Sequence, residues 1–232
     1  RTQELFRSAE EVNRGVYECW MFTRHRQFVT AQERLRDGVI GEIRSVAARF
    51  GFPQMERENV RYRKNLGGGM LLDACGYPLR AARILCGATN LIGAVMEQEV
   101  GFEVDTGGSA LLSSDAGPAA TIEWGGGRSY RNEIDIWGEK GSLLLQRAFS
   151  KPGTLETTLR FQFQVNNEVR TETLVPDNHF VTMFNEFAEA VQSNRNEEYR
   201  EDSLRQAELL DQIRRVSGFA ESDEEKPEAE KP

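Results

Sequence analysis

Three consecutive glycines, Gly67-Gly68-Gly69, lie between a basic, aromatic segment and an apolar segment that ends at Gly87. Glycine accepts a positive φ and lets the backbone approach a ligand or another segment closely. The residues that follow, 71–86, carry apolar side chains at helical spacing, and Pro78 must distort this helix because it lacks an N–H. The pattern therefore predicts a tight loop that leads directly into a buried helix.

Two side chains near the start of this helix indicate chemistry. Asp73 and Tyr77 are four residues apart, so they share one face of an α-helix. A carboxylate and a phenol side by side can hold a hydroxyl group and exchange a proton with it. The structural interpretation stays open beside this one: the glycines shape a turn, Asp73 caps the helix and Tyr77 is half-buried.

The order of the expected elements predicts the fold class. Helical patterns begin and end the chain, at 2–14 and 27–36 and again at 180–191 and 204–216. Strand patterns separated by turn residues are found at 16–22, 43–52, 91–104, 109–113, 120–124, 130–137, 142–147, 159–165 and 169–175. We therefore expect an α+β fold, with an open, predominantly antiparallel sheet and helices packed on one face.

The other face of this sheet is expected to contact another subunit. The strands carry more large apolar side chains than a solvated face needs: Leu111, Ile122, Trp124, Ile134, Ile136, Trp137, Phe161 and Phe163. Because helices cover only one side of a sheet, some of these residues should meet a second chain. The sequence thus predicts a homo-oligomer that associates through the sheet.

Composition excludes several classes of partner. The 232 residues are enough to bury one sizeable core. The net charge is −8, and residues 221–232, with six acidic residues and two lysines, form an acidic tail that we expect to be disordered. The chain has no basic stripe for nucleic acid and no apolar run as long as a membrane span.

The cysteines and histidines do not form a metal-binding pattern. Cys19, Cys75 and Cys86 lack metal spacing and lie in apolar surroundings, which favours reduced thiols in a cytoplasmic protein. His25 and His179 are far apart in the sequence, so surface or capping roles are expected for them.

The stretch from Gly67 to Tyr77 resembles a signature of the C-terminal domain of the Gfo/Idh/MocA family. These enzymes are nicotinamide-dependent oxidoreductases that act mainly on sugars and related polyols. Their loop has the pattern Gly-Gly-Gly-x-Leu-x-Asp-x-Gly-x-(His or Tyr). Tyr77 in place of His is closer to the glucose–fructose oxidoreductase and nucleotide-sugar ketoreductase branches.

The resemblance extends over nearly the whole chain. Residues 38–43 match the step Gly-x-Ile-Gly-x-Ile of the family, and 177–218 resemble its closing helix pair. Arg24 stands where the family has an Arg at the end of the last strand of its cofactor domain. The resemblance implies that 1–24 end a dinucleotide-binding domain and that 25–220 form the substrate and oligomerisation domain.

The resemblance also implies a cofactor, NAD or NADP, that this sequence does not accommodate. A dinucleotide site needs the turn Gly-x-Gly-x-x-Gly between a strand and a helix, and the sequence contains none. Glu225-Lys226-Pro227 spells the Glu-Lys-Pro motif of the family, but it lies in the acidic tail and is interpreted as a coincidence. The cofactor-binding residues are therefore unknown, and we expect the isolated chain to lack activity.

Site roles follow from the resemblance. Tyr77 would exchange a proton with a hydroxyl or ketone of a sugar or nucleotide sugar, and Asp73 would orient the substrate or the phenol. Substrate-binding candidates are Arg24, Arg61, Tyr62, Arg63, Gly68 and Gly69. Arginine forks match phosphates, although a solvated charge run, or an ion pair at Arg24, explains the same residues. The alternative function is a non-catalytic relic that serves as a dimerisation module or binds a glycan or protein partner.

Overall fold

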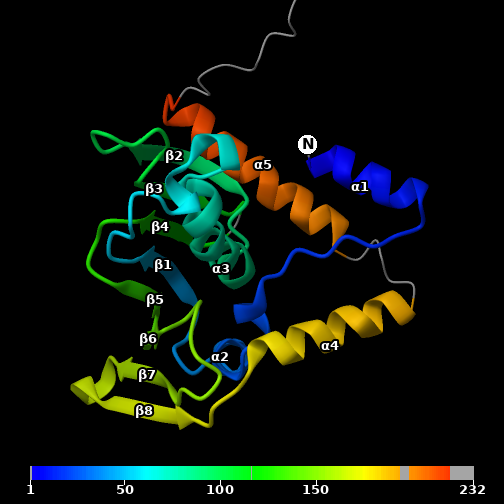
Figure 1. Ribbon diagram of the computed structural model, residues 1–232. Coiled ribbons are helices and arrows are strands. Elements are labelled where there is room, and N and C mark those ends of the chain that lie inside the picture. Colours follow the sequence, from blue (N-terminus) through cyan, green and yellow to red (C-terminus); the bar gives the residue numbers. More distant parts are fainter. Residues whose placement is uncertain (1, 116, 194–198, 220–232) are drawn as a thin grey trace, which may run out of the picture.

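A computed structural model describes residues 2–115, 117–193 and 199–219. Its centre is an eight-stranded sheet with the strand order β2-β3-β4-β1-β5-β6-β7-β8 (Figure 1). The neighbours β1 and β4 run parallel and every other pair is antiparallel. The strands are β1 (Ile43–Gly51), β2 (Asn90–Glu97), β3 (Gly107–Ser113), β4 (Ala119–Gly125), β5 (Arg131–Gly138), β6 (Gly141–Gln146), β7 (Thr157–Phe163) and β8 (Val169–Leu174).

The helices lie on one side of this sheet (Figure 1). They are α1 (Thr2–Glu11), α2 (Arg26–Arg36), α3 (Gly76–Cys86), α4 (His179–Gln192) and α5 (Arg200–Val216). Helix α3 packs on β1 and β4, α5 packs on β2, and α2 packs on β7. Short 3-10 helices occur at Met21–Arg24, Val60–Tyr62, Lys64–Leu66 and Val165–Asn167. The predicted α+β fold with a predominantly antiparallel sheet is confirmed.

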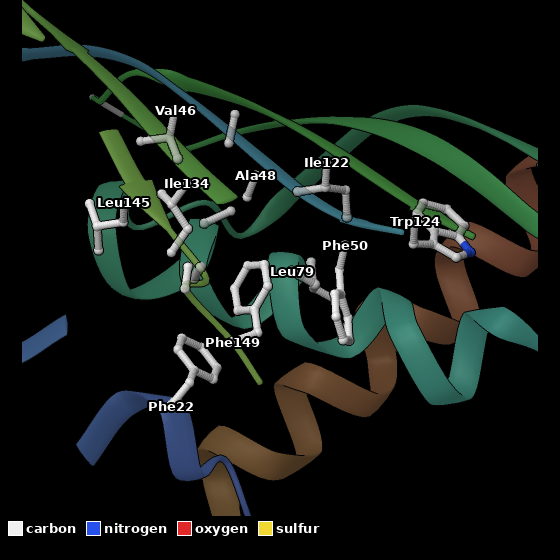
Figure 2. Packing of buried hydrophobic residues seen from close by; sticks show 14 of the residues in the cluster. Phe22, Val46, Ala48, Phe50, Leu79, Ile122, Trp124, Ile134, Leu145 and Phe149 are labelled. Carbon is white, nitrogen blue, oxygen red and sulfur yellow. The ribbon is translucent and has the colours of Figure 1, made fainter. Parts of the chain in front are cut away.

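The core lies between the sheet and the helices, because successive side chains of a strand point to opposite faces. On β1, Val46, Ala48 and Phe50 point toward the helices, and Ile134 and Ile122 of the neighbouring strands lie beside Ala48. Figure 2 shows these residues grouped around α3. The alternation thus provides one continuous apolar face for the helices to cover.

The same alternation corrects the predicted subunit surface. Ile122, Trp124, Ile134, Ile136 and Phe161 all lie on the helix-covered face and are at most 1% exposed. Of the eight residues expected to supply that surface, Leu111 and Trp137 are the exposed ones, and Phe163 is half-buried. Counting large apolar residues was therefore the wrong criterion, since most of them fill the core.

The centre of the other sheet face is polar. Arg49 of β1 lies between two acidic residues on its neighbours, at 3.0 Å from Glu123 of β4 and 3.4 Å from Glu133 of β5. Trp137 is 67% exposed on the same face. Association through this face remains a prediction.

Several element boundaries differ from the sequence predictions. The segment 16–22 forms no strand, because no described strand lies beside it, and its end belongs to the 3-10 helix Met21–Arg24. Strand β2 ends at Glu97 rather than at residue 104. Asparagine tolerates a positive φ, so Asn166-Asn167 between two alternating segments predicts a two-residue hairpin. Both residues have a positive φ, 60° and 51°, but they lie in a 3-10 turn that is longer than such a hairpin.

The helical spacing of 180–191 predicts a buried stripe on α4, which the structure does not show: Phe180, Met183, Phe184, Phe187 and Val191. Met183 is buried as predicted, whereas Phe180 and Phe184 are 45% and 57% exposed. His179 and Ala190 point inward beside Met183, so the buried face is rotated from the predicted one. None of the helices in the described ranges has the length and apolarity that a membrane crossing needs. The predicted acidic tail, 221–232, lies outside the described residues.

Candidate active site

The glycine loop is shaped by contacts that exclude side chains. Gly67 ends a 3-10 turn with a φ of 75°, and Gly69 has a φ of 123°. The Gly69 N–H donates to the Arg61 carbonyl at 2.8 Å. A Cβ on Gly68 would lie 2.6 Å from the same Arg61 oxygen. The loop therefore packs directly against the backbone of the preceding segment, as only glycine allows.

The helix after the loop begins in a widened form. Leu71–Cys75 is a π-helix, and the regular helix α3 starts at Gly76. Pro78 accounts for this, because its ring clashes with the carbonyl four residues earlier and it donates no hydrogen bond. The predicted distortion by Pro78 is thus confirmed. Asp73 lies in the π-helix and Tyr77 in the first turn of α3, a bulge of the kind often found at functional sites.

Tyr77 is enclosed by aromatic rings. Its ring centroid lies 5.3 Å from Trp20, 5.2 Å from Phe50, 6.0 Å from Phe149 and 6.1 Å from Phe22. Phe149 also contacts both Phe22 and Phe50, and Figure 2 shows the three rings gathered beside α3. The side chain of Tyr77 remains partly exposed. The phenol is therefore fixed in an apolar enclosure that leaves it within reach of a ligand.

Burial and the neighbouring charges both act on the pKa of Tyr77. Asp73 forms an ion pair with Arg61, with Oδ2 2.6 Å from the guanidinium Nε. Burial raises the pKa of Tyr77, the Asp73 carboxylate raises it further, and Arg61 lowers it in part. The pKa of the phenol thus stays above its ordinary value of about 10. Tyr77 is protonated at neutral pH and can act as a proton donor.

The structure brings together five of the predicted site residues: Arg61, Gly68, Gly69, Asp73 and Tyr77. Tyr62 differs, because it is 4% exposed, packs against Phe102 at 4.7 Å and accepts a hydrogen bond from the Met55 N–H. Its side chain belongs to the core in this structure, and a role in substrate binding stays a prediction. Arg63 is exposed on the same segment.

Arg24 has a partner in another element. Its guanidinium pairs with Glu186 of α4. The ion-pair interpretation therefore describes Arg24 in this structure, and a role in substrate binding stays a prediction.

Three residues that support the site were not identified from the sequence: Trp20, Asn132 and Phe149. A Cβ on Gly76 would lie 2.5 Å from the Trp20 ring. Because glycine has none, this indole packs directly on the start of α3. The Asn132 side chain accepts from the Phe149 N–H at 2.7 Å and thereby holds that ring beside Tyr77. No spacing or motif signals these contacts, because the residues are far apart in the sequence.

One position departs from the loop pattern expected from the resemblance. Cys75 stands where that pattern has its fourth glycine. The side chain is fully buried, and burial raises the pKa of its thiol well above the ordinary value. Cys75 is therefore an inert core residue, and the adjacent Gly76 makes the close contact with Trp20.

Neither a metal nor a dinucleotide fits the described residues. They contain no group of three or more His, Cys, Asp or Glu side chains that could hold a metal ion. Gly125-Gly126-Gly127 leads from β4 into β5 rather than into a helix. The described residues thus offer no glycine turn at a helix start of the dinucleotide-binding type.

The two histidines pack against each other rather than lying at the surface. Their rings are 5.3 Å apart and both side chains are buried. His25 caps α2, because its Nδ1 accepts from the Gln27 N–H at 3.0 Å. The capping role is confirmed for His25, and a surface role is wrong for both.

Comparison with known proteins identifies relatives over most of the chain. The dTDP-3,4-didehydro-2,6-dideoxy-alpha-D-glucose 3-reductases of Actinomadura kijaniata and Streptomyces antibioticus are 37% and 34% identical to it, over 92% and 88% of its length. The chain spans 64% and 63% of these enzymes, slightly less than two thirds.

Solved structures agree with these matches. The 3-ketoreductase from Actinomadura kijaniata in complex with NADP and TDP-benzene has a TM-score of 0.87 and 35% identity, over 93% of this chain and 66% of the enzyme. Solved variants of that enzyme include a Tyr-to-Phe substitution and two substitutions of one lysine. An aldose-aldose oxidoreductase from Caulobacter crescentus, 22% identical with a TM-score of 0.82, shares the fold.

The family profile of the GFO/IDH/MocA C-terminal domain matches residues 28–144, half of the chain. This match covers the glycine loop, the π-helix and Tyr77. The chain belongs to the Gfo/Idh/MocA family.

Proposed function

We propose that the chain is the substrate-binding and proton-transferring part of an NADP-dependent oxidoreductase that reduces a nucleotide-sugar ketone. The observation that carries this proposal is the protonated Tyr77 phenol, enclosed by aromatic rings and set beside the Asp73–Arg61 pair. The names of the 3-reductase relatives, and the NADP and TDP-benzene bound to one of them, support the class of cofactor and substrate.

Reduction of a ketone adds a hydride to the carbon and a proton to the oxygen, and Tyr77 supplies the proton. A donor must hold its proton until charge develops on the substrate oxygen. A phenol is protonated at neutral pH, and burial and the Asp73 charge raise the pKa of Tyr77 further. The hydride would come from a dinucleotide bound outside the described residues, which do not supply a site for it.

The ion pair positions the acceptor for a sugar hydroxyl. Arg61 engages Oδ2 of Asp73, which leaves the other carboxylate oxygen to accept from the hydroxyl next to the reacting carbon. Arg63, exposed on the same segment, is placed to meet a phosphate with its planar fork. In this proposal, 1–24 end a dinucleotide-binding domain and 25–220 form the substrate domain.

The test is Tyr77→Phe in the enzyme joined to its dinucleotide-binding domain, assayed with a dTDP-linked keto sugar and NADPH. Loss of a positioned proton donor typically costs a factor of about 100 to 10,000 in rate. The loss should appear in turnover, with the Michaelis constant nearly unchanged, because the proton moves only in the transition state.

Tyr62→Phe is the matched control, since it removes a phenol hydroxyl from the segment before the glycine loop and leaves the proposed donor in place. It should keep turnover near the wild-type value. Full turnover in Tyr77→Phe would assign the chemistry to another residue. Absence of turnover in the wild type, with NADPH bound, would favour the non-catalytic dimerisation or binding module instead.

A further inference from the structure

Asp105 lies in the loop between β2 and β3 and has no part in the chemistry proposed above. Its side chain is buried, with 6% of the residue exposed. The carboxylate Oδ2 accepts from the Leu71 N–H at 2.6 Å, and the Asp105 carbonyl accepts from the Met70 N–H at 3.2 Å. One distant residue therefore binds two consecutive amides at the point where the π-helix begins.

The glycine loop is built to receive this carboxylate. A Cβ on Gly69 would lie 2.4 Å from Asp105 Oδ1, so no larger residue fits between them. On the other side, Gly68 packs against the Arg61 backbone. The loop is thus held between two fixed supports, the segment that carries Arg61 and the carboxylate of Asp105.

A helix start needs such partners, because its first amides have no acceptor within the helix. Here the need is greater, since the first turn is a π-helix, a form that is rare and seldom stable without outside contacts. Asp73 is the third residue of this π-helix. Helix α3 follows directly, and Tyr77 is its second residue. The position of the helix start therefore determines where both side chains stand.

We propose that Asp105 is a positioning residue for proton transfer: by binding the amides of Met70 and Leu71, it holds Asp73 and Tyr77 in their productive places. This inference rests on the proposed function for its meaning but not for its test. Asp105 contacts the backbone of the site through these two amides.

The ionised carboxylate of Asp105 lowers the stability of the fold because it is buried. Burial raises the pKa of this carboxyl to about 6, although the Leu71 amide and Arg214 of α5 lower it in part. The Cys75 thiol of the π-helix also interacts with this carboxylate. A buried carboxylate is unfavourable unless its hydrogen bonds repay the loss of water. Asp105→Asn should therefore raise the midpoint of thermal unfolding at pH 7 while it loosens the helix start.

The experiment compares Asp105→Asn and Asp105→Ala with the wild-type chain. Tyrosines labelled with 13C at Cζ are titrated by NMR, and Tyr77→Phe assigns the Tyr77 signal. Hydrogen exchange is measured for the amides of Met70 and Leu71. We expect Asp105→Ala to move the pKa of Tyr77 toward 10 and to speed exchange of these amides about tenfold, because their acceptor is lost. Asp105→Asn keeps one acceptor oxygen and should show smaller changes in the same direction.

Leu159→Ala is the control for a loss of stability without a change at the helix start. Leu159 is fully buried on β7, separated from β4 by β6, β5 and β1. It should lower the unfolding midpoint and leave the Tyr77 titration unchanged. If Asp105→Ala fails to fold, Asp105→Asn decides the question alone.

The proposal would be overturned if the Asp105 variants kept the wild-type pKa of Tyr77 and the wild-type exchange rates of the Met70 and Leu71 amides. Asp105 would then contribute to the stability of the fold only. In the assembled enzyme, Asp105→Asn should lower turnover and change the Michaelis constant much less. The fold-loss in turnover should be about ten times the fold-rise in the Michaelis constant. Should Tyr77→Phe keep full turnover, the proposed function fails, yet the NMR and exchange results still decide whether Asp105 sets the place of Tyr77.

Discussion

The Arg61 Nε lies 2.6 Å from Oδ2 of Asp73, across the glycine loop that separates the two residues. Both side chains are about one third exposed, 39% for Arg61 and 30% for Asp73. An ion pair at this exposure adds little to stability. Its effect is local, because it places a cation and an anion beside the Tyr77 phenol. Asp73 raises the pKa of this phenol and Arg61 lowers it.

Asp73→Asn should lower the pKa of Tyr77, because it removes the charge that opposes phenolate and leaves Arg61 in place. Arg61→Met should raise the pKa of Tyr77 for the converse reason. A tyrosinate absorbance titration, compared with Tyr77→Phe, measures both. In the assembled enzyme Asp73→Asn should also raise the Michaelis constant. Equal Tyr77 titrations in the two variants would contradict the electrostatic coupling.

Gly69→Ala should destabilise the chain much more than Gly67→Ala. Both glycines have a positive φ, but a Cβ on Gly67 meets nothing within 4 Å, whereas on Gly69 it meets Asp105 at 2.4 Å. Backbone strain in the Gly67 variant costs about 1–2 kcal/mol. The Gly69 variant adds the clash and the loss of the Asp105 contacts, and urea unfolding measures the difference. Similar values for the two variants would show that the loop relaxes freely.

His179→Phe should reduce the loss of stability that acid causes. Burial lowers the pKa of His25 and His179 to about 4, with Lys151 acting against protonation and Asp177 acting for it. The unfolded chain binds protons near pH 6.5 and the folded chain only near pH 4, so each histidine costs stability as the pH falls between these values.

Asp105 has the opposite effect on stability over part of this pH range. Its folded pKa, about 6, is above the unfolded value near 3.9, so its contribution to stability is largest below pH 4 and is lost as the pH rises through 6. Unfolding midpoints from pH 4 to 7 should therefore fall less steeply in His179→Phe and more steeply in Asp105→Asn. Parallel curves for wild type and His179→Phe would show that His179 titrates normally.

Trp137→Lys should weaken self-association if the chain pairs through the open face of the sheet. Trp137 is 67% exposed and lines a shallow hollow with Ser45, Ser142 and Gln162. Ile136→Lys is the contrast, because Ile136 is fully buried under the helices and its substitution should unfold the chain. Light scattering gives the mass of each species. A monomeric wild type at high concentration would contradict association through the sheet.

The fold was largely predictable because its patterns are local. Strict alternation on β7 and β8 and the helical spacing of 27–36 appear in a few consecutive residues. The errors arose where contacts with another element determine the local structure. The segment 16–22 has the composition of a strand but has no described strand to pair with, and α4 buries His179 where the spacing favoured Phe180.

The site was predictable in part for the same reason. Gly67-Gly68-Gly69, Asp73 and Tyr77 lie within eleven residues, so their spacing and their resemblance to the Gfo/Idh/MocA loop were visible in one line of sequence. The pairing of Arg61 with Asp73 was not visible, because Arg61 was expected to face the substrate.

The sequence by itself determined where the chain turns, because glycine and proline act on the backbone at their own positions. It also determined which residue types reach the site, a carboxylate and a phenol one helical turn apart. Tertiary structure alone decided how they behave. The rings of Trp20 and Phe149 and the carboxylate of Asp105 come from other elements, and only folding brings their apolar surface and charge within the few ångströms over which they act on Tyr77 and its helix.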